Sequence, residues 1–183
     1  MAARQELFPD TIITGELLAH LQRAVDVERT ELVGGRLYAL PPNPVLHGLM
    51  LPRLCHLIRE EHGWVGLAGR VGLWTQHRPD TVRAPDFVLL SRKQWQAVNP
   101  ETWLTAAALV VEITMPSLVD EDIDQKTAEY VALGSQVWNI DIDARSLTVD
   151  VRAGRSVLCA GDSVTLPSGQ VLPVADMFNV GLP

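Results

Sequence analysis

Three side chains of this sequence have the types and spacing that metal-assisted chemistry uses: the carboxylates of Asp86 and Glu112 and the ammonium group of Lys126. Glu112 stands inside the apolar run "LVVEI", residues 109–113, where burial of a charge is costly unless a partner compensates it. Asp86 precedes a second apolar run, "FVLL", residues 87–90. If these runs form neighbouring β-strands, the two carboxylates lie close together.

Two carboxylates that lie close together need a compensating charge. At a separation of about 4 Å they repel by about 4 kcal/mol when the effective dielectric constant is near 20. Oxygen ligands favour Mg²⁺ or Mn²⁺ over zinc, and Mg²⁺ typically takes one or two carboxylates and retains water. The pattern therefore predicts a divalent metal site at Asp86 and Glu112. Two alternatives stay open for Glu112, a neutral carboxyl group and an ion pair with an arginine.

Lys126 belongs to a predicted helix that begins at Asp120 or Asp122 and ends at Leu133, before Gly134. The stripe of this helix that would pack on a sheet consists of Ile123, Thr127, Tyr130 and Gly134. At about 100° per residue, Lys126 lies about 60° from the centre of that stripe, so its ammonium group points partly inward. There it could hold a water or stabilise charge on a transferred phosphate. A lysine at the border of a solvent-exposed face is the structural alternative.

The elements around these residues predict a mixed α/β fold. Residues 107–113 form a strand with little alternation, as expected when both faces are covered. The strand "QVWNIDI" follows the Lys126 helix, and a short strand–helix–strand unit favours a right-handed crossover with parallel strands. A preceding helix is predicted from about Val45, with Pro52 expected to kink or delay it.

Further elements are predicted on both sides of this unit. Thr14 can cap a first helix, and the Gly34–Gly35 pair suits a tight β-hairpin. Two β-like pieces flank Gly69, as one bent strand or a hairpin, and helices are predicted to start at Ser91 and at Asn99-Pro100. From Leu147 onward the alternation predicts a β meander with a structural role.

Composition sets wider limits. Hydrophobic residues make up 47% of the chain, and no apolar run approaches the ~20 residues of a membrane-spanning helix. "MAARQELFPD" lacks the layout of a secretory signal, and Cys55 and Cys159 have no metal or redox spacing, so a cytoplasmic location is expected. The net charge of -7 argues against a broadly basic surface but leaves room for a local basic groove. No linker-like run divides the chain, so we expect one domain over residues 1–183.

Four stretches, "APD", "VVEI", "KTAEY" and "VWNID", together resemble the PD-(D/E)XK nuclease superfamily, and specifically its Uma-two (Uma2) family of restriction-endonuclease-like proteins. The resemblance extends to "ELVGGRLYALPPNPVLH" and covers nearly the whole chain. It implies a restriction-endonuclease-like αβββαβ core over about residues 45–142, with a mixed sheet flanked by helices. The N-terminal helix and hairpin and the C-terminal β meander would be added to this core.

The resemblance also implies roles for single residues. Asp86 and Glu112 would be ligands of Mg²⁺ or Mn²⁺. Lys126 would be the displaced lysine of the motif, because the ordinary E-x-K position holds Thr114.

Four other positions correspond to family features around the site. Glu31 matches the early glutamate of the family and His47 its early histidine, and both would border the site. Tyr130 matches a helix tyrosine, for which we expect a packing role. Met115 stands where the family usually has a serine.

The function implied is a Mg²⁺-dependent endonuclease that hydrolyses phosphodiester bonds in DNA, and a homodimer would suit cleavage of two strands. Two alternatives stay open. One is a catalytically silent module that keeps the nuclease fold to bind nucleic acid or a protein partner, which Thr114, Met115 and the acidic net charge motivate. The other is a hydrolase of a different phosphate compound, such as a nucleotide or RNA.

Overall fold

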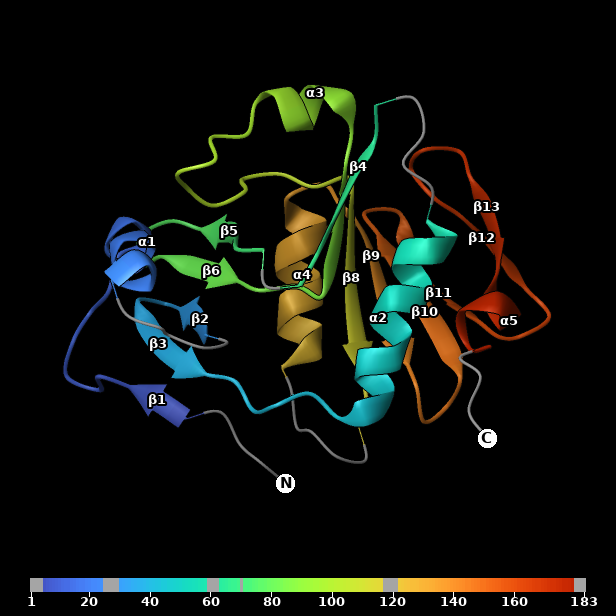
Figure 1. Cartoon of the computed structure of the whole chain (residues 1–183), viewed down its shortest axis with the longest axis horizontal. Coiled ribbons are helices and arrows are strands. Elements are labelled where there is room, and N and C mark those ends of the chain that lie inside the picture. Colours follow the sequence, from blue (N-terminus) through green and yellow to red (C-terminus); the bar gives the residue numbers. More distant parts are fainter. Residues whose placement is uncertain (1–4, 25–29, 59–62, 70, 117–121, 180–183) are drawn as a thin grey trace.

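A mixed six-stranded sheet forms the centre of the fold. The computed structural model describes residues 5–24, 30–58, 63–69, 71–116 and 122–179 (Figure 1). Within this part of the chain, the largest sheet has the strand order β11-β10-β9-β8-β7-β4. Its strands are β4 (Val65–Ala68), β7 (Phe87–Leu90), β8 (Leu109–Thr114), β9 (Gln136–Asp141), β10 (Ser146–Val151) and β11 (Gly154–Leu158). Strands β8 and β9 are parallel and the other neighbours antiparallel, which confirms the predicted mixed sheet and the crossover pairing.

Helices lie on both faces of this sheet (Figure 1). The described helices are α1 (Gly15–Ala24), α2 (Val45–Leu57), α3 (Arg92–Gln96), α4 (Ile123–Ala132) and α5 (Val174–Met177). Alternation along β8 assigns its side chains to two faces. Val111 belongs to the apolar core that includes Met50 of α2, whereas Val110 packs in the core that includes Tyr130 of α4. Glu112 has the parity of Val110, so its side chain faces α4.

A second sheet lies beside the central one, with the order β1-β3-β2-β6-β5. Its strands are β1 (Gln5–Leu7), β2 (Thr30–Val33), β3 (Arg36–Ala39), β5 (Leu73–Gln76) and β6 (Thr81–Arg83). The predicted hairpin joins β2 to β3, with Val33 paired to Arg36 across the two-glycine turn. Gly34 and Gly35 have φ angles of 58° and 79°, which a glycine adopts without steric cost.

The sheet assignment corrects the prediction around Gly69. The two β-like pieces are neither one bent strand nor a hairpin, because β4 belongs to the central sheet and β5 to the second sheet. Gly69, at φ 72°, and the residues after it carry the chain from one sheet to the other. The αβββαβ order is therefore kept by α2, β4, β7, β8, α4 and β9, with β5 and β6 inserted.

Two helix predictions have different outcomes. Ser91 caps α3 as predicted: its hydroxyl accepts a hydrogen bond from the Gln94 backbone, and the Gln94 side chain accepts one from the Ser91 backbone. The helix predicted at Asn99-Pro100 is wrong. The Asn99 side chain accepts a hydrogen bond from the Glu101 backbone N–H, which stabilises a turn, and Leu104 then pairs with Leu73 of β5.

Predictions for the other helices are largely confirmed. Helix α2 begins at Val45 and continues through Pro52 to Leu57. Pro52 removes the helical hydrogen bond to the carbonyl of Gly48, and the helix tolerates this loss because both residues lie on its exposed side. Helix α4 ends before Gly134, whose φ of 91° suits a C-terminal cap.

The C-terminal meander is divided between two sheets. Strands β10 and β11 extend the central sheet, whereas β12 (Ser163–Thr165) and β13 (Val171–Pro173) form a separate pair that precedes α5. Among the described helices, none is both long enough and apolar enough to cross a lipid bilayer.

Candidate active site

The two predicted metal ligands face each other across β7 and β8. Phe87 pairs with Val111, so the antiparallel register continued by one residue places Asp86 opposite Glu112. The Asp86 carboxylate also contacts the backbone of β8, since its Oδ2 accepts a hydrogen bond of 2.8 Å from the Ile113 backbone N–H. Both carboxylates are buried, at 9% and 4% exposure. The structure thus brings together the two acidic groups on which the metal prediction depends.

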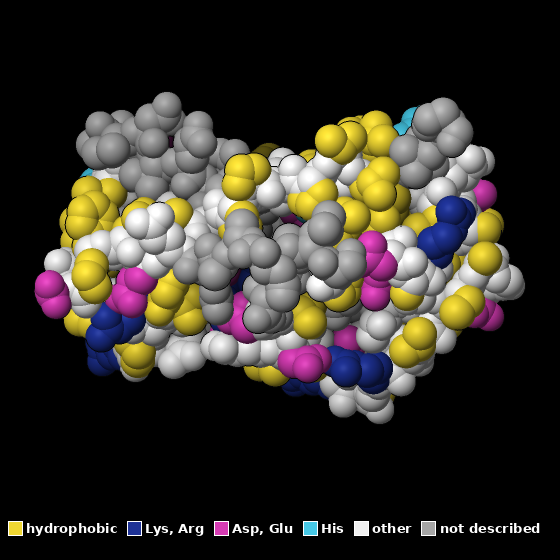
Figure 2. All heavy atoms as spheres, turned by 90° about the horizontal axis from the view of Figure 1, so that it is seen from below, with side chains coloured by type: hydrophobic (Ala, Val, Ile, Leu, Met, Phe, Trp, Pro, Cys, Tyr) yellow, Lys and Arg dark blue, Asp and Glu magenta, His cyan; other side chains and the backbone are white. Residues whose placement is uncertain are grey.

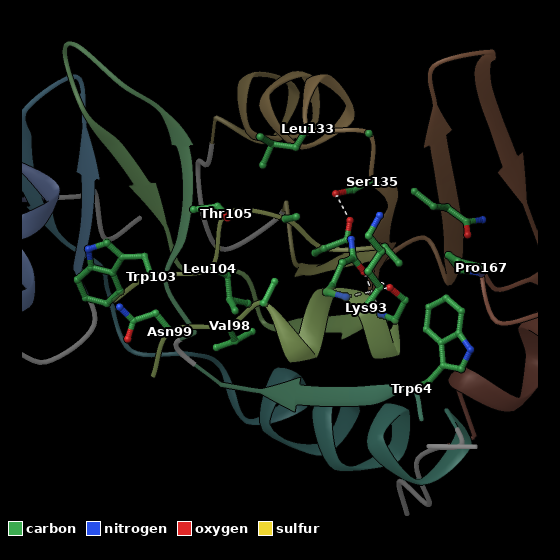
Figure 3. A pocket seen from close by; sticks show the side chains of 18 of the residues that line it. Trp64, Lys93, Val98, Asn99, Trp103, Leu104, Thr105, Leu133, Ser135 and Pro167 are labelled. Atoms are coloured by element: carbon green, nitrogen blue, oxygen red, sulfur yellow. Dashed lines mark hydrogen bonds between the residues drawn. The ribbon is translucent and has the colours of Figure 1, made fainter. Parts of the chain in front are cut away.

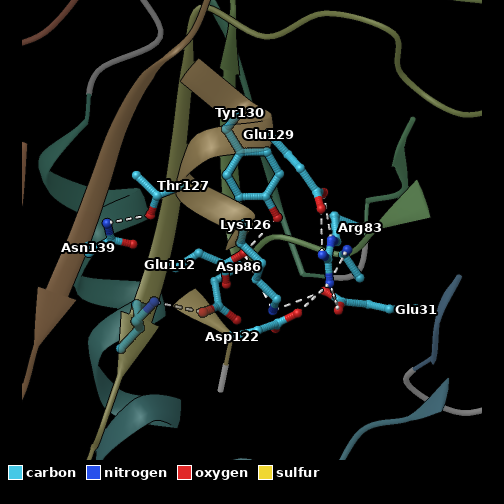
Figure 4. Close-up of polar contacts among 12 residues, drawn as sticks. Glu31, Arg83, Asp86, Glu112, Asp122, Lys126, Thr127, Glu129, Tyr130 and Asn139 are labelled. Atoms are coloured by element: carbon cyan, nitrogen blue, oxygen red, sulfur yellow. Dashed lines mark hydrogen bonds and ion pairs between the residues drawn. The ribbon is translucent and has the colours of Figure 1, made fainter. Parts of the chain in front are cut away.

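Lys126 extends from the first turns of α4 toward these carboxylates (Figure 4). Its Nζ lies 3.0 Å from Oε1 of Glu31 and 3.8 Å from Oε1 of Glu112. The side chain is 5% exposed, so the predicted inward orientation is confirmed. The nearer carboxylate is that of Glu31 on β2, which ties the second sheet to the site.

Tyr130 lies one helical turn after Lys126 and contacts the same glutamate. Its hydroxyl donates a 2.7 Å hydrogen bond to Oε1 of Glu112, so the packing role predicted for this tyrosine is incomplete. Burial raises the pKa of Tyr130 well above its usual value, and the negative charges of Glu112 and Glu31 raise it further. The phenol therefore stays protonated and orients the Glu112 carboxylate.

His47 reaches Asp86 from the first turn of α2, around the end of the sheet. Its Nε2 lies 2.9 Å from Oδ2 of Asp86, and the side chain is 6% exposed. The Asn43 amide nitrogen lies 3.0 Å from Nδ1 and 3.3 Å from Nε2 of the same ring. His47 therefore contacts both Asp86 and Asn43.

Arg83 is the group that reasoning from the sequence missed. It is fully buried on β6, and Figure 4 shows its guanidinium group between Glu129 and Glu31. Two parallel hydrogen bonds of 2.8 and 2.7 Å join it to Glu129. Its Nη1 lies 3.2 Å from Oε2 of Glu31 and 3.3 Å from Oδ2 of Asp122. The arginine was foreseeable only as the generic ion-pair alternative, and it compensates these three carboxylates rather than Glu112.

The electrostatics of this cluster follow from burial and pairing. Burial alone would lower the pKa of Arg83, but the hydrogen bonds to Glu129 and the charges of Glu31, Glu129 and Asp122 outweigh it, and the pKa is raised. For Glu129 the signs are reversed: burial raises its pKa, while the hydrogen bonds and charge of Arg83 and the hydroxyl of Thr75 lower it overall. Both groups are therefore charged at neutral pH.

Charge counting leaves the cluster negative. Its carboxylates are Asp86, Glu31, Glu112, Asp122 and Glu129. Among the described residues, the Arg and Lys side chains that lie against these five carboxylates are Arg83 and Lys126, so the formal charges leave an excess of three negative charges before His47 is counted. An added divalent cation would offset most of this excess.

A small cavity occupies the centre of the arrangement. It has a volume of about 20 Å³, and Asp86, Glu112, His47 and Lys126 all line it. That volume accommodates one water or one ion. Among the described residues, no three or more His, Cys, Asp or Glu side chains are grouped as metal ligands. Two carboxylates beside a water-sized cavity are a donor set that fits Mg²⁺ or Mn²⁺, with water as the remaining ligands.

The comparisons with known proteins identify the family and the fold. Residues 17–182 match the Uma2 family, described as "Putative restriction endonuclease". The chain belongs to the Uma2 family. A crystal structure from Anabaena variabilis ATCC 29413, titled as that of a "putative nuclease belonging to DUF820", has a similar fold, with a TM-score of 0.69 at 15% sequence identity. The match covers 86% of this chain and 93% of that chain. No functionally curated protein matches the sequence.

In this Uma2 protein, the predicted site residues occupy two positions relative to the cavity. The cavity is lined by Asp86, Glu112, His47 and Lys126. Glu31 is not among its lining residues and contacts Lys126 instead. The acidic run before α4 contributes Asp122, which contacts Arg83. The other predicted start of this helix, Asp120, lies outside the described residues.

Proposed function

We propose that the chain is a Mg²⁺- or Mn²⁺-dependent endonuclease of the PD-(D/E)XK superfamily that hydrolyses phosphodiester bonds in DNA. The observation that supports this proposal is the convergence of Asp86, Glu112 and Lys126 on one water-sized cavity. The three side chains come from different elements, 14 to 40 residues apart in the chain, so local packing does not require them to meet. Membership of the Uma2 family supports the same reading.

Asp86 and Glu112 would hold the metal. Such an ion, when bound, polarises a phosphate and lowers the pKa of a bound water. The carboxylates are pre-oriented for this role by hydrogen-bonding partners, since the Ile113 N–H and His47 contact Asp86 and the Tyr130 hydroxyl contacts Glu112. Pre-oriented ligands reduce the ordering that binding would otherwise require.

Lys126 would act on the attacking water or on a phosphate oxygen. Its ammonium group lies 3.0 Å from Oε1 of Glu31 and 3.8 Å from Oε1 of Glu112, and its side chain lines the cavity, so these carboxylates hold the charge beside any group bound there. Arg83 holds the other oxygen of Glu31, so the arginine fixes the glutamate and the glutamate fixes the lysine. We assign Glu31 and Arg83 as positioning residues.

The surface around the site limits how DNA would bind. Figure 2 views the molecule from the side where α2 begins, and its described Lys and Arg side chains form separate groups interspersed with Asp and Glu. On the described part of this face, phosphate contacts would therefore be local. A homodimer would place two cavities on one duplex, which sedimentation in the presence of a short duplex can test.

A plasmid-nicking assay tests the proposal. Supercoiled plasmid is incubated with the wild type in Mg²⁺, Mn²⁺ or EDTA, and with the Asp86→Asn and Glu112→Gln variants. We expect metal-dependent nicking that each variant reduces by at least about 100-fold, since lost stabilisation of a few kcal/mol in the transition state has that size. Glu16→Gln, an exposed carboxylate of α1, is the matched control. Nicking that persists in both site variants would exclude this assignment.

The specific pairing of the carboxylates favours one second candidate, a catalytically silent module that binds nucleic acid or a protein. Asp86 already contacts His47, and Glu112 already contacts Tyr130 and Lys126. Calorimetry with MgCl₂ and MnCl₂ distinguishes the two: millimolar binding that Glu112→Gln removes supports the enzyme, and its absence supports the silent module. Substrate panels with single-stranded DNA, RNA and nucleotides then test for a different phosphate substrate.

A further inference from the structure

A second and much larger cavity lies at the other end of the central sheet (Figure 3). It has a volume of about 1090 Å³ and lies between the residues that follow α3, the starts of β8 and β9, and the end of α4. It shares no lining residue with the small carboxylate cavity. Along β8, Ala108 and Glu112 are four residues apart, or about 13 Å at the usual rise of a strand. The two cavities are therefore separate sites on common elements.

The charge of this large cavity is opposite to that of the whole chain. Among the described residues, its lining contains two cations, Lys93 and Arg152, and no Asp or Glu, although the chain has 22 acidic residues. Within the described part of the chain, neither cation forms an ion pair, and Arg152 only donates a hydrogen bond of 3.1 Å to the Ala132 carbonyl. Both side chains are exposed, so their charges are available to a ligand.

The remaining lining is largely apolar, with an aromatic ring at one end. Figure 3 shows Trp64, Lys93 and Pro167 at one end of the cavity and Val98 and Leu104 toward the other. Trp64 is half-buried and packs against the main apolar core, which holds its ring in place. A fixed tryptophan beside a lysine offers a stacking surface and a charge to the same ligand.

Several polar groups of the lining are already used by the fold. The Ser135 hydroxyl donates 2.8 Å to the Ala107 carbonyl, and the Gln136 amide donates 3.1 Å to the Thr165 carbonyl. The Asn99 side chain accepts from the Glu101 backbone. Recognition in this cavity must therefore rest mainly on the two cations and the apolar surface.

We propose that this cavity binds an organic anion with a flat aromatic body, of the nucleoside monophosphate class. Trp64 would stack on the aromatic body, and Lys93 and Arg152 would contact the phosphate. The volume is sufficient for a ligand of this size, for which pockets typically measure about 300–1,000 Å³. This site is distinct from the catalytic site proposed above and does not depend on it.

Calorimetry in EDTA tests the proposal on the full chain, with AMP, adenosine and ribose 5-phosphate as probes. EDTA prevents binding of the phosphate through a metal at the carboxylates. AMP should bind at millimolar concentration or tighter, and adenosine, which lacks the phosphate, should bind more weakly by about fivefold or more. Ribose 5-phosphate, which lacks the base, should also bind more weakly than AMP.

Single-charge variants localise the binding. Lys93→Ala and Arg152→Ala should each weaken AMP binding by up to about fivefold and leave adenosine binding unchanged. Arg78→Ala removes an equivalent exposed charge away from the cavity and should have no effect. Glu112→Gln should bind AMP as the wild type does, so failure of the nuclease proposal does not affect this test.

Three results would overturn the proposal: no AMP binding at millimolar concentration, equal affinity for AMP and adenosine, or AMP binding that neither cation variant weakens. Ribose 5-phosphate bound as tightly as AMP would contradict the aromatic part of the ligand class.

Discussion

The charged side chains at the two ends of strand β8 differ in burial and in pairing. At the carboxylate end, formed around Asp86 and Glu112, charges are buried and each contacts a partner. At the pocket end, formed around Lys93 and Arg152, the cations are exposed, and the described lining residues include no carboxylate. The first arrangement couples charge to folding, whereas the second leaves charge available for a ligand.

Strand β8 and helix α4 both extend between the two ends, and side-chain size along them explains this contrast. Strand β8 begins after Ala107 and Ala108, whose small side chains leave space at the pocket end, and continues to Glu112. Helix α4 likewise carries Lys126 in its first turns and is followed by Gly134 beside the pocket. Removal of a charge should therefore be costly at one end and nearly neutral at the other.

The largest effect is expected for Arg83→Met. This change leaves the buried Glu31 and the half-buried Asp122 and Glu129 without the cation that they share, which should cost about 3–5 kcal/mol of unfolding free energy. Urea unfolding followed by circular dichroism measures it. Arg155→Met, whose ion pairs with Asp150 and Asp124 are half-exposed, should cost no more than about 1 kcal/mol. Equal losses in the two variants would contradict the structural role of Arg83.

A smaller loss is expected for Tyr130→Phe. The ring remains, but Oε1 of the buried Glu112 loses a 2.7 Å donor, which should cost about 1–3 kcal/mol. The same variant should lower nicking by less than Glu112→Gln does, because the carboxylate itself is retained. Unchanged stability and activity would show that Glu112 keeps its orientation without the Tyr130 hydroxyl.

Asp86→Asn tests whether repulsion or pairing dominates at the carboxylate end. The sequence alone predicts a neutral or stabilising effect in EDTA, because the change relieves repulsion with Glu112. The structure shows two donors on Oδ2 of Asp86, from His47 and from the Ile113 backbone. An asparagine oxygen accepts less strongly than a carboxylate, so we now expect a loss of about 1 kcal/mol. If the variant were more stable than the wild type in urea unfolding, repulsion between Asp86 and Glu112 would outweigh the contacts of Asp86.

The fold and the site were predictable to different degrees. Local patterns were sufficient for α2, β7, β8, α4 and β9, because alternation and helical spacing are properties of neighbouring residues. The angular position of Lys126 on its helix likewise predicted its inward orientation. The assignment of β4 and β5 to different sheets depends on long-range pairing, which no local pattern encodes.

The network behind the site escaped prediction for the same reason. The partners of Arg83 lie 52, 39 and 46 residues away in the chain, on β2, before α4 and on α4. An arginine three residues before Asp86 gives no sign of these contacts. The hydrogen bond of the Tyr130 hydroxyl was not predicted. A tyrosine that only packs and a tyrosine that also forms a hydrogen bond occupy the same position on the apolar stripe of a helix, so spacing does not distinguish them.

Acid should weaken the carboxylate end through Glu129. Because its pKa in the folded protein lies below the usual value of 4.5, its stabilising contribution is present above about pH 4.5 and is lost as the pH falls through the folded-state pKa. The wild type should therefore lose more unfolding free energy between pH 5 and pH 3 than Glu129→Gln, which cannot titrate there. Parallel urea titrations at several pH values compare the two. Identical pH profiles would mean that Glu129 gains nothing from Arg83.

The smallest effect is expected at the pocket end. Lys93→Ala and Arg152→Ala remove exposed charges that form no ion pair within the described chain, so each should change the unfolding free energy by no more than about 0.5 kcal/mol. Urea unfolding beside Arg83→Met measures the contrast under one set of conditions. A loss above 1 kcal/mol in either pocket variant would show that these cations support the fold, and their charge would then no longer be free for a ligand. A negligible loss would instead show that the fold does not need these two charges, which is the condition that a recognition role requires.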